Sequence, residues 1–96
     1  MSAYVIYLGD ILDETAYQAY REAVEPDILA AGGRYVVRGG DPELLEGNLP
    51  ASRTVILEFS SRQAALDWYE SPSYREIKKL REHSARASVY IVDTLG

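Results

Sequence analysis

The sequence predicts an α+β fold, in which a four-stranded antiparallel sheet carries its helices on one face. Two observations lead to this fold class. Short runs rich in β-branched and aromatic residues alternate with longer segments of helical periodicity. Their order along the chain is strand, helix, strand, strand, helix, strand. The chain has 96 residues, the size of one typical domain, so we expect residues 1–96 to form a single domain.

The first part of the chain supplies a strand, a helix and a second strand. The run AYVIYL at 3–8 is short, apolar and β-branched, which is typical of a strand. Asp13 is a suitable N-cap for the helical pattern that follows, and Pro26 predicts a kink or a restart within that pattern. The glycine pair 32–33 ends the helix. The run RYVVR at 34–38 is the second strand.

The second part supplies two more strands and a broken helix. A long polar connection at 40–52 contains glycine and proline punctuation. The run RTVILEF at 53–59 is the third strand, and SSRQ at 60–63 resembles a capping box that starts a helix at Ser60. The Ser-Pro pair at 71–72 predicts a second start within this helical region. The run RASVYIVD at 86–93 is the last strand.

This βαββαβ order is that of a ferredoxin-like domain, with both helices on one face of the sheet. The other face of such a sheet is left uncovered. We expect a second copy of the chain to cover it, which gives a homodimeric α/β barrel.

Composition narrows the possible partners and surroundings. The formal net charge is −5, which argues against nucleic acids and anionic membrane surfaces. The sequence has no cysteine, and therefore no disulfide or thiolate chemistry. Neither a basic leader nor an apolar run of about 20 residues is visible, so we expect a cytoplasmic location.

Alternation along each strand predicts which residues share a face of the sheet. The set expected beneath the helices is Tyr4, Ile6, Leu8, Tyr35, Val37, Val55, Leu57, Phe59, Val89 and Ile91. The set expected on the dimer side is Val5, Tyr7, Arg34, Val36, Arg38, Thr54, Ile56, Glu58, Ser88, Tyr90 and Val92. If the two middle strands pair as a hairpin centred near Glu46, Arg34 lies opposite Glu58. In the same register, Arg38 lies opposite Thr54.

The segment GGRYVVRGG at 32–40 suggests a phosphate-binding loop at first sight. Its glycines follow a helix and bracket a strand, however, which fits neither a Walker loop nor a dinucleotide fingerprint. Arg34 and Arg38 are about 13 Å apart along a strand, too far to grip one small phosphate. Each could bind a separate carboxylate, or Arg34 could pair with Glu58. Glu58 is also a candidate general base, although an adjacent arginine would lower its pKa.

Arg81, Trp68 and His83 are further candidates for a functional role. Arg81 follows Ile77 by four residues on an apolar helix face, so it needs either an acidic loop residue such as Glu46 or a ligand. Trp68 and its neighbouring tyrosines are either core residues or a stacking platform. His83 is the only histidine and has no ligand set around it, so we expect a solvated residue and no metal site.

Two long segments resemble the domain of unknown function 1330 (DUF1330) family. They are GGRYVVRGGDPELLEG and RTVILEFSSRQAALDWYESPSYREIKKLR, and the likeness extends from Tyr4 to Asp93. The block W-Y-x-S-P-x-Y at 68–74 is fairly specific, as are the two glycine pairs around the second strand. The resemblance implies a dimeric α/β-barrel superfamily that includes cofactor-independent monooxygenases, dehalogenases, isomerases and haem-degrading enzymes. Many of these use a cleft between sheet and helices.

For function, the sequence favours a homodimer that binds or turns over a small acidic metabolite without a cofactor. The residues expected to contact the ligand are Arg34, Arg38, Glu58, Arg81, Tyr7, Tyr90 and Trp68. The alternative is a structural or interaction module without a small-molecule ligand, in which the charged residues only fix loop and subunit geometry. Whether the protein is an enzyme is left open by the sequence.

Overall fold

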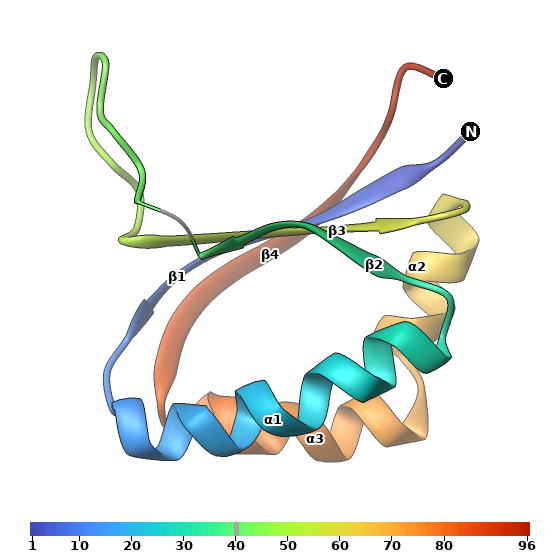
Figure 1. Cartoon of the computed structure of the whole chain (residues 1–96), viewed down its shortest axis with the longest axis horizontal. Coiled ribbons are helices and arrows are strands. Elements are labelled where there is room, and N and C mark those ends of the chain that lie inside the picture. Colours follow the sequence, from blue (N-terminus) through green and yellow to red (C-terminus); the bar gives the residue numbers. More distant parts are fainter. Residues whose placement is uncertain (40) are drawn as a thin grey trace.

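The computed structural model describes residues 1–39 and 41–96, and it contains an antiparallel sheet covered on one face by helices (Figure 1). The strands are β1 (Ala3–Ile11), β2 (Arg34–Gly39), β3 (Arg53–Phe59) and β4 (Ala85–Asp93). The helices are α1 (Glu14–Ala30), α2 (Arg62–Tyr69) and α3 (Pro72–Glu82). The sheet order is β2-β3-β1-β4. The predicted ferredoxin-like βαββαβ fold is therefore confirmed.

Side-chain caps explain where the helices begin. Asp13, Ser61 and Ser71 each accept a hydrogen bond from the backbone N–H three residues further on. The expected cap at Ser60 is thus one residue too early. α1 passes through Pro26 as one helix and does not restart there. Among the described residues, no helix is long and apolar enough to span a membrane.

A bulge in β2 changes the predicted register. Arg34 lies opposite Glu58, as predicted. The pairing then shifts between Tyr35 and Val37, so that Val36 has no opposite residue and Arg38 lies opposite Val55. An extra residue in a strand moves every later side chain to the other face. Arg38 therefore lies on the helix side of the sheet, and the predicted Arg38 position on the dimer side is wrong.

The predicted faces of β1 are also reversed. Val5 lies opposite Leu57 on β3 and Ile91 on β4, and Tyr7 lies opposite Val55 and Val89. Since directly paired residues share a face, Val5 and Tyr7 point toward the helices, where they are buried. Tyr4, Ile6 and Leu8 belong to the other face. Odd- and even-numbered residues of β1 are both largely apolar, so their alternation does not indicate which of them face the helices.

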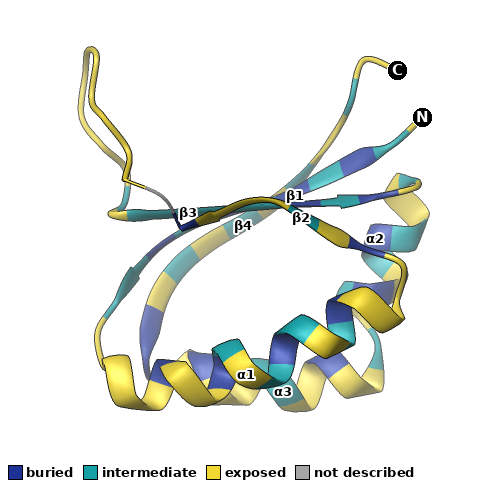
Figure 2. Ribbon diagram, viewed as in Figure 1, coloured by how far each residue is buried: buried dark blue, intermediate teal, exposed yellow. Residues whose placement is uncertain are grey.

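The core lies between the sheet and the helices (Figure 2). Its buried members are Val5, Tyr17, Tyr20, Val24, Ile28, Leu57, Phe59, Ala65, Trp68, Tyr74 and Ala85. The rings of Phe59 and Trp68 stack with centroids 5.4 Å apart. None of the described residues forms a covering layer on the opposite face, and the connection at 41–52 extends on that side of the sheet (Figure 1).

Candidate functional site

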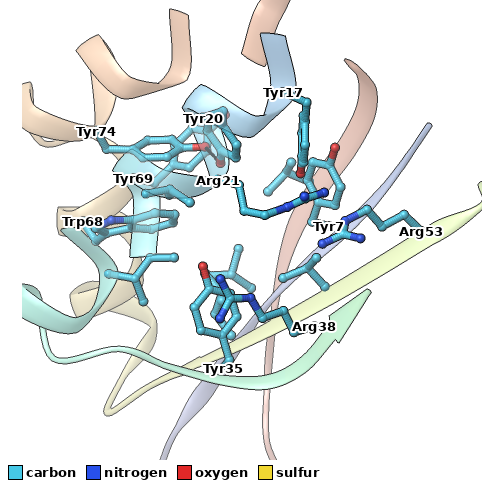
Figure 3. A pocket seen from close by; sticks show the side chains of 16 residues that line it. Tyr7, Tyr17, Tyr20, Arg21, Tyr35, Arg38, Arg53, Trp68, Tyr69 and Tyr74 are labelled. Atoms are coloured by element: carbon cyan, nitrogen blue, oxygen red, sulfur yellow. Dashed lines mark hydrogen bonds between the residues drawn. The ribbon is translucent and has the colours of Figure 1, made fainter. Parts of the chain in front are cut away.

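A cleft opens between the helix-facing side of the sheet and the helices (Figure 3). Its cavity volume is about 50 Å³, and the empty space between its walls, which includes open solvent, is about 550 Å³. The lining residues are Val5, Tyr7, Tyr17, Tyr20, Arg21, Val24, Ile28, Tyr35, Arg38, Arg53, Val55, Leu57, Trp68, Tyr69, Tyr74 and Val89. This lining contains three arginines and no carboxylate, although the whole chain carries a net charge of −5.

Arg38 reaches the cleft because of the bulge in β2. Its two terminal nitrogens donate to the carboxylate of Glu25 on α1, at 3.1 and 3.0 Å. Its guanidinium also lies over the ring of Tyr35, 4.5 Å from the centroid. These hydrogen bonds from Arg38 hold the pKa of the Glu25 carboxyl below its usual range. The pair links the edge strand to α1 beside the cleft.

Arg53 and Arg21 approach the ring of Tyr17 from β3 and α1 (Figure 3). Their guanidinium carbons lie 5.9 and 5.2 Å from its centroid. Arg21 donates a hydrogen bond to Gln18 at 2.8 Å and forms an ion pair with Glu14 at 3.9 Å, whereas Arg53 forms no ion pair with any described residue. In both arginines the Nε atom is buried and has no hydrogen-bond partner among the described residues. Two buried donors near one end of the cleft thus lack a partner among the described residues.

Two glycines make room for the polar side chains of the cleft. Gly39 has a φ of +83°, and a Cβ there would lie 2.7 Å from Nη1 of Arg53. The Arg53 guanidinium therefore passes directly over the Gly39 backbone. A Cβ on Gly9 would lie 2.6 Å from the ring of Tyr7. The glycine at the end of β2 consequently serves the position of Arg53 and not the binding of a phosphate.

The aromatic end of the cleft is held by hydrogen bonds and ring packing. The hydroxyls of Tyr20 and Tyr74 lie 2.8 Å apart, and Trp68 donates from its indole nitrogen to Asp27 at 3.0 Å. The rings of Trp68 and Tyr74 have centroids 4.3 Å apart. Burial raises the pKa of Tyr20, and proximity to Tyr74 adds to this increase. The Tyr20 hydroxyl therefore stays protonated at neutral pH.

Arg81 is buried behind the cleft rather than exposed within it. Its guanidinium carbon lies 5.6 Å from the ring centroids of both Tyr7 and Tyr20, and Nη2 lies 3.5 Å from the hydroxyl of Tyr74. Burial opposes its charge, but Tyr74, Tyr20 and Tyr7 together raise the pKa of Arg81. The salt bridge to Glu46 considered from the sequence is not formed in this structure. Arg81 supports the tyrosines that line the cleft.

The structure divides the predicted site residues between the two faces of the sheet. Tyr7, Arg38 and Trp68 line the cleft, and Arg81 lies behind it. Arg34 and Glu58 form an ion pair on the uncovered face, where Tyr90 is also exposed. The seven residues therefore do not form one site.

Several cleft residues were missed by the sequence prediction. They are Arg21, Arg53, Tyr17, Tyr20 and Tyr35. Arg21 follows Tyr17 by four residues on α1, a spacing that places both on neighbouring positions of one helix face. Arg53 shares its strand parity with Val55 and Leu57, which indicates the helix side of the sheet. Both signals were available in the sequence.

The family described as Domain of unknown function (DUF1330) matches residues 2–95. The chain belongs to this family. The resemblance inferred from the glycine pairs and the W-Y-x-S-P-x-Y block is thus confirmed. Among curated proteins, none matches this DUF1330 chain.

Solved structures with the same fold extend over almost the whole DUF1330 chain. The RPA0582 protein of unknown function from Rhodopseudomonas palustris has a TM-score of 0.79 at 22% identity, covering 99% of this chain and 83% of that one. A dimeric ferredoxin-like protein of unknown function from Jannaschia sp. CCS1 has a TM-score of 0.67 at 17% identity, with 98% and 100% covered. A dimeric protein of unknown function with a ferredoxin-like fold, from Bacteroides fragilis NCTC 9343, has a TM-score of 0.64 at 13% identity, with 97% and 96% covered. These likenesses concern the fold.

Proposed function

We propose that this DUF1330 protein is a homodimer that binds, or turns over without a cofactor, a small acidic metabolite in the cleft between sheet and helices. The observation that carries this proposal is the charge of the cleft. An acidic chain places Arg21, Arg38 and Arg53 around one cavity and no carboxylate in its lining. Such a local reversal of charge attracts anions in a partly enclosed, low-dielectric space.

The unpartnered nitrogens of the cleft support an anionic ligand. A buried donor without a partner is unfavourable by about 1–3 kcal/mol, so a fold retains such groups where something else satisfies them. The Nε atoms of Arg21 and Arg53 are in this position. Hydrogen bonds between a guanidinium and a carboxylate are charge-assisted and among the stronger ones in proteins. A small carboxylic acid therefore complements the cleft.

The alternative remains a structural module, in which Arg38 and Glu25 only tie β2 to α1. Replacing Arg38 with methionine distinguishes the binding protein from the structural module. If the cleft binds an acid, Arg38→Met lowers the free energy of unfolding by less than about 1 kcal/mol, because the ion pair is partly exposed. Ligand affinity falls at least about tenfold. Urea unfolding measures the first effect and isothermal titration calorimetry the second.

A matched control is Arg62→Met, because Arg62 also forms a partly exposed ion pair, with Asp93, but does not line the cleft. This variant should bind the ligand like the wild type. The ligand is found by a thermal-shift screen of small carboxylic acids at millimolar concentration, since a bound ligand stabilises the folded state. The absence of any stabilising acid would contradict the binding proposal.

The uncovered face of the sheet supports the homodimer. Val37, Ile56, Ile6 and Tyr90 lie opposite one another in a row that crosses all four strands. Val37 and Tyr90, at the two ends of this row, are 36% and 46% exposed. A continuous apolar row on a sheet surface is typical of a face that another layer covers. The row is its own complement under two-fold symmetry, so we propose a second copy as that layer.

We expect the double variant Val37→Lys, Tyr90→Lys to be monomeric, because four lysines would meet in each dimer interface. Multi-angle light scattering should give about twice 10.7 kDa for the wild type and 10.7 kDa for the variant. Leu29→Lys is the control, since Leu29 is 55% exposed on α1, away from the row. A wild-type mass of one chain at micromolar concentration would overturn the homodimer.

A further inference from the structure

We propose that the acidic ligand is a planar aromatic carboxylate with a single ring, held by its carboxylate at Arg21 and Arg53. This inference rests on the proposed function, which it makes specific: it names the chemical class of the acid and its orientation. Three features of the cleft carry it, namely the separation of its charged and aromatic ends, its unpartnered donors and its size.

The charged and aromatic side chains occupy different ends of the cleft. In Figure 3, Arg21 and Arg53 point inward on one side, and Trp68, Tyr69 and Tyr74 lie on the other. Apolar side chains of the sheet line the space between the two ends. A ligand that fills such a space needs a negative group at one end and an apolar body at the other.

The donors at the charged end match one carboxylate. The Nε atoms of Arg21 and Arg53 are buried and lack a hydrogen-bond partner among the described residues, and the hydroxyl of Tyr7 is buried beside Tyr17. A carboxylate offers two oxygens with about four acceptor positions, so one such group can accept from two guanidinium groups at once. Burial is the main cause that raises the pKa of Tyr7, so its hydroxyl keeps the proton that it would donate.

The walls of the remaining space favour a flat ring. Tyr35, Trp68 and Tyr69 come from three different elements and present aromatic surfaces to the cleft. Aromatic rings interact with one another beyond the burial of their area, and a guanidinium over a ring adds a cation–π contact. Arg38 already makes such a contact with Tyr35. A conjugated ring gains these interactions, whereas a saturated ring of the same size does not.

The size of the cleft limits the ligand to one ring. Its cavity volume is only about 50 Å³, although the empty space between its walls, which includes open solvent, is larger. A single ring can enter at its edge, with its acid group near the arginines. The Arg21 side chain is 29% exposed, so the carboxylate end lies toward solvent.

Calorimetric titration of the full chain with five probes tests this inference. The probes are benzoate, cyclohexanecarboxylate, propionate, benzyl alcohol and 1-naphthoate. We expect benzoate to bind at least about fivefold more tightly than the saturated and aliphatic acids. Benzyl alcohol, which lacks the charge, should show no measurable binding, and the fused ring of 1-naphthoate should weaken binding. Equal affinities for benzoate and cyclohexanecarboxylate would overturn the aromatic inference while leaving the proposed acid binding intact. If none of the acids binds, both fail.

Two variants test the orientation of the ligand. Arg53→Gln should weaken benzoate binding at least about tenfold, because its guanidinium has no other ion-pair partner among the described residues. Tyr7→Phe should weaken it severalfold. Arg62→Gln is the control and should leave the affinity unchanged. The melting temperature of each variant shows whether it is folded, and an Arg53→Gln protein that melts like the wild type yet binds benzoate equally well would overturn the orientation.

Discussion

Replacing Phe59 with alanine should lower the free energy of unfolding by about 3–5 kcal/mol, the range for removing a fully buried aromatic ring. Phe59 is 1% exposed at the end of β3 and stacks on Trp68. Its ring also contacts the backbone of Gly33, where a Cβ would lie only 2.6 Å away. Because its neighbours come from the sheet, α2 and the start of β2, no single element can move to fill the cavity. A domain of this size has about 5–15 kcal/mol of stability, so the loss is a large fraction of the total.

Urea unfolding followed by far-ultraviolet circular dichroism measures this change without relying on the fluorescence of Trp68, which touches the mutated ring. Leu29→Ala serves as the control, because Leu29 is 55% exposed on α1. Its effect should stay within about 0.5 kcal/mol. A decrease below about 1.5 kcal/mol for Phe59→Ala would contradict the central position of this ring in the core.

The order of elements could be predicted because local signals and the tertiary structure agree. Asp13 and Ser71 are caps in the sequence pattern and in the structure, and Gly32 ends α1 with a φ of +87°. Each of these signals involves residues within one turn of each other. They depend little on what packs against them, so the sequence alone suffices.

The orientation of individual strand residues could not be predicted in the same way. The bulge at Val36 leaves no mark in a run of two valines, yet it moves Arg38 from one face of the sheet to the other. β1 is apolar on both faces, so its orientation is fixed only by its partners, Val5 with Leu57 and Ile91. The bulge in β2 and the orientation of β1 together place Arg38 and Tyr7 on the helix side of the sheet, away from Arg34 and Glu58.

The cleft itself depends on contacts between distant segments. Arg53 and Arg21 are separated along the chain, and they meet only because β3 passes beneath α1, where both approach Tyr17. Sequence alternation indicates that Arg53 faces the helices, but it does not indicate that no acidic residue accompanies it there. The positive charge of the cleft comes from residues that are distant in the sequence and meet only in the folded chain. The acidic overall composition therefore did not indicate where a positively charged cleft would lie.

The protein should lose stability steeply above pH 10, because its buried tyrosines cannot ionise in the folded state. Burial is the main cause that raises the pKa values of Tyr7, Tyr20 and Tyr35. In the unfolded chain these groups lose their protons near pH 10, the ordinary pKa of tyrosine. Above that pH the folded state holds more protons than the unfolded state, so stability falls as pH rises. Below pH 10 the full stabilisation is present.

The expected slope is about 1.4 kcal/mol per pH unit for each tyrosine that remains protonated in the folded state. Urea unfolding at pH 8, 10 and 11 measures it, and absorbance near 295 nm reports when the phenols ionise. Tyr20→Phe is the informative variant, because Tyr20 is 7% exposed and its removal deletes one buried phenol. The variant is less stable at pH 8, where it lacks the hydrogen bond to Tyr74. Above pH 10, its free energy of unfolding should fall less steeply with pH, by the contribution of one tyrosine. Identical slopes for the two proteins would show that Tyr20 ionises in the folded state, and the closed aromatic end of the cleft would then be wrong.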